Sequence, residues 1–142
     1  RERIVIFFTS LHRTSPTLNA TILSSLFLFI LWQFAYLIPF LSRHCTCSMA
    51  NIRSGRVHSI FLSTVSHTSL HHLLLNLYML YSLGIGMMTK LRGNALYPFI
   101  IGSSLVGSLF FLALTKGGSC IGLSGVTCAM LGFECRWDPM RE

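Results

Sequence analysis

A cluster of imidazole and amide side chains interrupts an apolar stretch near the middle of the chain. His67, His71, His72 and Asn76 lie within ten positions of one another. Polar groups at membrane depth are energetically costly unless they line a cavity or find a partner. If the stretch is helical, His72 and Asn76 share one face, because they are four residues apart. They could donate hydrogen bonds into a common cavity, or they could bridge neighbouring helices; four such residues together favour the cavity.

A second polar stretch, Gly122-Leu123-Ser124-Gly125, follows later in the chain. It differs from the Gly-x-Ser-x-Gly nucleophile elbow, because Val126 occupies the final glycine position. A serine at a helix N-terminus meets unpaired N–H groups and the positive end of the helix dipole. Those groups would stabilise an oxyanion formed beside the Ser124 N–H, and the glycines leave space around the hydroxyl. The alternative is that Ser124 caps a helix while the glycines allow close packing.

Histidines also suggest zinc, but the pattern for a zinc site is incomplete. His67 and His71 have the spacing of two ligands on one helix face, yet no His-Glu-x-x-His is present. No acidic residue occurs between positions 3 and 133 to serve as a third ligand or as a base. We therefore disfavour an intramembrane metalloprotease and expect neither a metal nor another cofactor.

The cysteines do not predict a disulfide scaffold. There are five of them, an odd number, and their spacings form no paired framework. The cluster His44-Cys45-Thr46-Cys47 lacks a second pair of metal ligands, so we interpret it as a loop with ordinary thiols.

The elements that must position these stretches are apolar helices. Of the 142 residues, 52% are hydrophobic and 11% are charged, and the mean hydropathy is +0.63. This composition predicts an all-α, polytopic membrane helix bundle. We expect helices at about 18–41, 67–88, 96–115 and 124–135, with a polar first loop at 42–59. The net charge of +7 lies in short clusters between the apolar runs, which indicates loops at a lipid surface rather than binding of nucleic acid.

The last predicted helix is too short to cross a bilayer. A helix over 124–135 covers roughly 15–18 Å at 1.5 Å per residue, about half of a bilayer core. Either the sequence is cut, or the helix begins part-way into the membrane. In the second case Ser124 would lie at the bottom of a cavity.

Together the two polar stretches resemble the rhomboid family of intramembrane serine proteases. The resemblance rests on His67-x4-His72-x3-Asn76 in one helix and Gly122-x-Ser124-Gly125 at the start of a later one. It implies a six-helix core, of which residues 1–142 would hold four helices as a partial rhomboid domain. It also implies an endopeptidase that cleaves single-pass transmembrane proteins within the lipid bilayer through an acyl-enzyme.

The resemblance assigns roles to individual residues. Ser124 corresponds to the nucleophile, and His72 and Asn76 correspond to side-chain donors to the oxyanion. His67 matches a position that supports the first loop, and Gly122 and Gly125 match the glycines beside the nucleophile.

One departure concerns the general base. In the family it is a histidine on the sixth helix, in a Gly-x3-Ala-His setting, but no histidine follows Ser124 in this sequence. A serine needs a base in reach to attack at neutral pH. We therefore expect a C-terminally truncated fragment that is inactive as it stands. The alternative is a protease-dead rhomboid-like protein that binds membrane helices; a channel or transporter is disfavoured because inverted repeats are missing.

A finer resemblance concerns the location in the cell. The stretch from Phe61 to Ser82, together with Leu31-Trp32, is similar to the mitochondrial presenilin-associated rhomboid-like branch of the family. This similarity implies an integral, multi-pass protein of the mitochondrial inner membrane.

Overall fold

The computed structural model describes residues 15–91, 94–115 and 117–136, and most of these residues are helical. The helices are α2 (Pro16–Trp32), α3 (Ile38–His44), α4 (Met49–Arg53), α5 (Ser59–Thr64), α6 (Leu70–Lys90), α7 (Leu96–Leu114) and α8 (Ser124–Arg136), with a 3-10 turn, η1, at Ala35–Leu37. Two short strands, β1 (Cys47–Ser48) and β2 (Ser119–Cys120), pair antiparallel. The predicted all-α class is confirmed.

The predicted helix over 18–41 is interrupted. It begins as expected, because the Ser15 hydroxyl accepts a hydrogen bond from the Thr17 N–H and Pro16 occupies the first turn. After Trp32 the chain bends by 102° before Ala35–His44. Pro39 disfavours a continuous α-helix through 35–39, because its ring would clash with the Ala35 carbonyl. Starting α3 anew places Pro39 in a first turn, where its missing N–H costs nothing.

The segment predicted as a polar loop, 42–59, contains ordered structure around Asn51. The side chain of Asn51 is buried and donates hydrogen bonds to the carbonyls of Ser42 and Thr46. Its amide oxygen accepts from the Arg56 guanidinium at 3.1 and 3.2 Å. These bonds satisfy backbone groups that would otherwise be unpaired, so the segment folds into β1, α4 and the start of α5.

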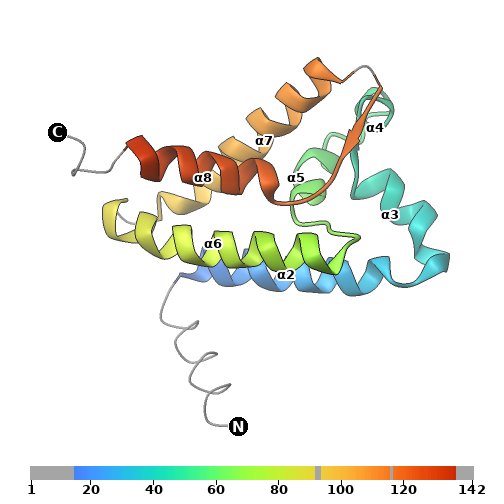
Figure 1. Ribbon diagram of the computed structural model, residues 1–142. Helices are drawn as coiled ribbons and strands as arrows, with labels where there is room; N and C mark the ends of the chain where they lie inside the picture. The colour runs from blue at the N-terminus through green and yellow to red at the C-terminus, as the bar shows by residue number, and fades with distance from the viewer. Residues whose placement is uncertain (1–14, 92–93, 116, 137–142) are drawn as a thin grey trace, which may run out of the picture.

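The main core lies where α2, α6, α7 and α8 meet, and Figure 1 shows α8 lying alongside α6 and passing in front of α7. Eight buried side chains form it: Leu18, Leu80, Met87, Leu96, Ile100, Leu123, Val126 and Met130. Small residues allow the close approach of helices, as a Cβ on Gly107 would lie 3.6 Å from the Gly125 backbone. Leu123 and Val126 belong to the core, so the start of α8 is fixed by packing as well as by hydrogen bonds.

The described helices include one, α7, that is long and apolar enough to cross a membrane. Counting α2 and the bent Ala35–His44 segment as one broken span gives a second. The predicted second helix, 67–88, corresponds to α6, whose 21 residues include His71, His72 and Asn76 and are less apolar than those of α7. Outward-facing side chains on these helices are strongly apolar: Phe27, Leu75 and Phe110 are 61%, 63% and 64% exposed. Such faces fit contact with lipid rather than water.

Candidate functional site

The two polar stretches predicted from the sequence meet in the structure. The backbone N–H of Leu123 donates to Nε2 of His67 at 3.3 Å. One turn into α8, the Thr127 hydroxyl donates to Oδ1 of Asn76 at 3.3 Å. In addition, the Gly122 N–H donates to the Ser63 carbonyl at 2.8 Å. Three hydrogen bonds therefore hold the start of α8 and the two residues before it against α5, the connection between α5 and α6, and α6 itself.

Gly122 allows the closest of these approaches. A Cβ at this position would lie 2.5 Å from Cε1 of His72, which is too close for any real side chain. The backbone φ of Gly122 is +113°, a conformation that L-residues rarely adopt. The imidazole of His72 thus lies directly against the main chain two residues before Ser124.

His67 is a neutral, fully buried acceptor. Its ring lies edge-on to that of His72, with centroids 5.1 Å apart. Because Nε2 accepts from the Leu123 N–H, the single ring proton of the neutral form must be on Nδ1. Burial, and to a smaller extent the neighbouring His72, lower the pKa of His67 to about 4. The structure thus brings His67 against the segment before Ser124, and the support of the first loop that the family resemblance implies for His67 stays a prediction.

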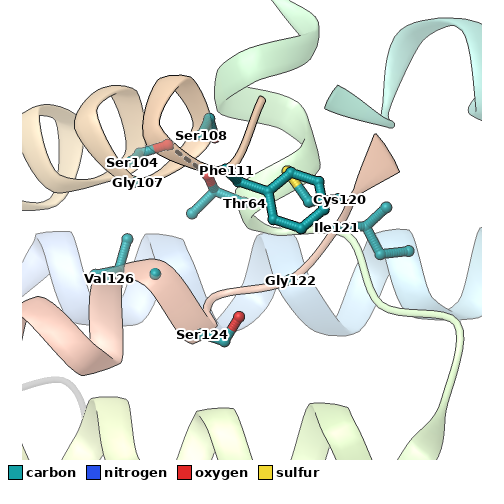
Figure 2. A pocket seen from close by; sticks show the side chains of 11 residues that line it. Thr64, Ser104, Gly107, Ser108, Phe111, Cys120, Ile121, Gly122, Ser124 and Val126 are labelled. Carbon is teal, nitrogen blue, oxygen red and sulfur yellow. Dashed lines mark hydrogen bonds between the residues drawn. The ribbon is translucent and has the colours of Figure 1, made fainter. Parts of the chain in front are cut away.

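Ser124 is the first residue of α8 and is exposed. It borders a cavity of about 140 Å³ between α5, α7 and the start of α8, together with Gly122 and Gly125. Figure 2 shows the Ser124 side chain near this cavity, with Thr64, Ser104 and Cys120 on the other side. The Thr127 N–H donates to the Leu123 carbonyl, so Leu123 caps α8 and the backbone N–H groups of its first turn, beginning with Ser124, are not used within the helix.

The amide of Asn76 is largely occupied by structural hydrogen bonds. Its nitrogen donates to the His72 carbonyl at 2.8 Å, and its oxygen accepts from Thr127. Asn76 is 4% exposed, so it lies beneath the surface of the site. An amide nitrogen carries two protons, so one donor remains beyond the bond to His72.

His71 lies outside this arrangement, although the sequence includes it in the same cluster. It is exposed, whereas its neighbours on α6, His72 and Leu73, turn inward. The helical period explains this, because adjacent residues are about 100° apart around the helix axis.

Thr127 is a site residue that the sequence analysis missed. It is buried, and its hydroxyl is shared between Asn76 and the Ser124 carbonyl at 3.1 Å. The available signal was its position three residues after Ser124, which puts both residues on the same side of a helix. A threonine there can join the serine segment to the asparagine of another helix.

Comparison with known proteins identifies the family of this chain. The family model for the rhomboid domain matches residues 54–142, more than half of the chain and the part that contains both polar stretches. RHOMBOID-like protein 12, mitochondrial, from Arabidopsis thaliana is 27% identical over 84 residues. The matched segment is 59% of this chain and 25% of that relative, so the chain spans only part of the relative's length. The packing of His67 and His72 on the residues before Ser124, and the match of the rhomboid domain over the same region, together place the chain in the rhomboid family.

Proposed function

We propose that this membrane protein carries the nucleophile half of an intramembrane serine endopeptidase site, with Ser124 as the nucleophile. The observation that carries the proposal is the contact of His67 and His72 with Leu123 and Gly122. That contact fixes the backbone on the N-terminal side of Ser124 while leaving its hydroxyl at the edge of a cavity. A peptide carbonyl of a single-pass transmembrane substrate would be attacked there, giving an acyl-enzyme.

The oxyanion of that attack would be stabilised from two sides. The Ser124 N–H is at the N-terminus of a 13-residue helix, where free N–H groups and the helix dipole favour negative charge. His72 lies against Gly122 and would add an imidazole N–H. The second amide proton of Asn76 would be the remaining donor, oriented by the hydrogen bond of its oxygen to Thr127.

His67 is a positioning residue rather than a base. Its Nε2 is already an acceptor for the Leu123 N–H, and its low pKa of about 4 makes it a poor proton acceptor. No histidine follows Ser124 in the sequence, so we propose that these 142 residues by themselves lack the general base.

Labelling with a fluorophosphonate tests this proposal. The probe forms a bond between phosphorus and the serine oxygen, fluoride leaves, and a base must take the hydroxyl proton. We expect negligible labelling of the chain in detergent micelles, and labelling at Ser124 when free imidazole is added as an external base. Ser124→Ala should abolish the signal, and Ser119→Ala, a change at the exposed start of β2, should leave it intact. Absence of labelling in folded protein at high imidazole would exclude Ser124 as the nucleophile.

The alternative function is a rhomboid-like protein without protease activity that binds membrane helices. A cavity of about 170 Å³ between α2, α5 and α7, lined by Ala20, Phe61 and Ile100 among others, favours it. A photoreactive group placed at Ala20 would capture a transmembrane peptide equally well in wild type and in Ser124→Ala. If the peptide is captured and Ser124 is not labelled by the fluorophosphonate either with or without imidazole, binding is favoured over hydrolysis.

The mitochondrial inner membrane is the proposed location. Two observations support it, the similarity of the stretch from Phe61 to Ser82 to a mitochondrial branch and the mitochondrial designation of the Arabidopsis relative. Fractionation of cells that express a tagged protein, with carbonate extraction of the mitochondrial membranes, tests the location. Recovery of the protein in another membrane fraction would contradict it.

A further inference from the structure

We propose that Cys47 and Cys120 are a disulfide-forming pair that, when oxidised, joins the first loop to the strand that leads to Ser124. The two residues are directly opposite each other in the antiparallel pair of β1 and β2, with Ser48 opposite Ser119. Both thiols are free in this structure. The proposal is independent of the catalytic role of Ser124, because it rests on the register of the two strands.

The register brings the cysteines within bonding range. Residues directly opposite in an antiparallel pair have Cα atoms about 4.5–5.5 Å apart, and disulfides span Cα separations of about 4.4–6.8 Å. Side chains of directly opposite residues point to the same face of the sheet. The two thiol groups of Cys47 and Cys120 interact with each other, and both lie near Ser108 of α7. Little backbone movement is therefore needed to form the bond.

The remaining cysteines are placed differently. Cys45 is buried in a separate cluster with Leu28 and Leu41. Cys128 and Cys135 are exposed on α8, and neither is opposite another cysteine in a strand pair. The structure thus singles out one pair among the five thiols.

Oxidation would begin at Cys120. Cys47 is fully buried, whereas Cys120 is partly exposed and lines the cavity next to Ser124, as Figure 2 shows. With a small-molecule disulfide such as glutathione disulfide as the oxidant, the Cys120 thiolate attacks one sulfur and releases one small thiol. The Cys47 thiolate then attacks Sγ of Cys120 and releases the second. Two protein thiols are oxidised, one small disulfide is reduced to two thiols, and the protons from the protein thiols end on the released thiolates.

The surroundings of the pair make this reaction slow at neutral pH. Burial raises the pKa of Cys120 to about 11, with the nearby Cys47 as the next cause, and burial raises the pKa of Cys47 as well. The reactive species is the thiolate. As long as the pH is below the pKa of Cys120, the rate of bond formation should therefore increase roughly tenfold for each unit by which the pH is raised. The exposed thiols of Cys128 and Cys135 provide an internal comparison.

The bond would change the segment that precedes the serine. β2 ends at Cys120, and Gly122 and Ser124 follow immediately. β1 leads into α4 of the first loop. A disulfide between the strands would therefore restrict any movement of the first loop away from the Ser124 segment.

Peptide mapping of the whole chain tests the proposal. Reduced protein in detergent is incubated with glutathione disulfide at pH 8.5, the remaining thiols are alkylated after denaturation, and disulfide-linked peptides are identified by mass spectrometry. We expect a peptide linking Cys47 to Cys120, and Cys45 should be recovered as an alkylated thiol. Cys45→Ser should form the same link, whereas Cys47→Ser should stop at a mixed disulfide of Cys120 with glutathione. Two results with the wild-type protein would overturn the proposal. One is a disulfide from Cys47 or Cys120 to Cys45. The other is recovery of both Cys47 and Cys120 as fully alkylated thiols when Cys128 has reacted with glutathione disulfide.

Discussion

The backbone N–H of Leu123 donates to Nε2 of His67, across a sequence separation of 56 residues. This bond is one of the direct contacts between the two stretches that carry candidate chemistry. It orients the main chain immediately before Ser124 and requires His67 to be neutral with its proton on Nδ1.

Replacing His67 with alanine should destabilise the protein strongly. The change leaves the Leu123 N–H buried without an acceptor and creates a cavity where the imidazole was. Loss of one buried hydrogen bond and of a buried ring costs on the order of 2–4 kcal/mol. Chemical unfolding in detergent measures the change in the free energy of unfolding. His71→Ala is the matched control, because His71 is an exposed histidine four residues later, in the first turn of α6, and its effect should stay within about 0.5 kcal/mol. Equal effects of the two changes would contradict the role given to His67.

Gly122→Ala should destabilise the folded protein for two separable reasons. The new Cβ would lie 2.5 Å from the His72 ring, and the φ of +113° is strained for alanine. We expect the free energy of unfolding to decrease by about 2–4 kcal/mol, of which backbone strain accounts for about 1–3 kcal/mol. Gly117→Ala isolates the strain, because Gly117 has φ of +85° with open space around it. Adding His72→Ala to Gly122→Ala should recover the part of the lost stability that the steric clash causes. Strictly additive effects of the two changes in this double-mutant cycle would exclude the contact between Gly122 and His72.

Sequence patterns predicted much of this arrangement because they depend on local periodicity. The four-residue spacing of His72 and Asn76 fixes their common side on α6, and glycines beside Ser124 predict a tightly packed helix start. The helical class follows from long apolar runs with few charges.

Features that depend on contacts between distant segments were not predictable. The bend after Trp32 brings Leu41 and Cys45 against Leu28, a contact that only the folded chain creates, although Pro39 gave a local hint. The opposition of Cys47 and Cys120 depends on a strand register that two-residue strands do not encode. The same limit applies to Thr127, whose importance comes from Asn76 on a different helix.

Acidification should weaken folding through His67. Its pKa is lowered to about 4 in the folded protein, against about 6.5 for an unperturbed histidine. The unfolded state therefore binds a proton first as the pH falls. The contribution of His67 to stability is fully present above pH 6.5, decreases between 6.5 and 4, and changes no further below 4. The loss is at most about 3 kcal/mol, since one pKa unit corresponds to 1.36 kcal/mol.

Comparison of wild type with His67→Gln isolates that effect from the other histidines. The free energy of unfolding is measured at pH 7.5, 5.5 and 4.5 in the same detergent. The difference between the two proteins should shrink as the pH falls, because glutamine does not titrate. A difference that is constant over this range would show that protonation of His67 is not coupled to folding.

Thr127→Val should loosen the attachment of α8 to α6. The substitution keeps the shape of the side chain but removes the hydroxyl that donates to Asn76, leaving the amide oxygen buried without that donor. We expect a loss of about 1–2 kcal/mol in the free energy of unfolding. Thr89→Val is the control, because the Thr89 hydroxyl is exposed and bonds the carbonyl of Gly86 within α6. Amide hydrogen exchange at the start of α8 should increase in Thr127→Val but not in Thr89→Val; unchanged exchange in both would argue against the bridge.

The ion pair between Lys90 and Glu134 should fix the far end of α8 against α6. The two side chains are 24% and 21% exposed, so the pair is partly shielded from water. Removing one partner of a pair at this depth should cost more stability than it does for an exposed pair and less than it does for a fully buried pair. Glu134→Gln keeps the shape and removes the charge, and we expect a loss of about 1–2 kcal/mol that becomes smaller at high salt. Thermal unfolding in 50 mM and 500 mM salt measures it, with Lys90→Gln/Glu134→Gln as the control that leaves neither charge unpaired. The double variant should lose less stability than the two single variants lose in sum, because the charges are coupled. Simple additivity of the losses would mean that the pair does not help to hold α8 against α6.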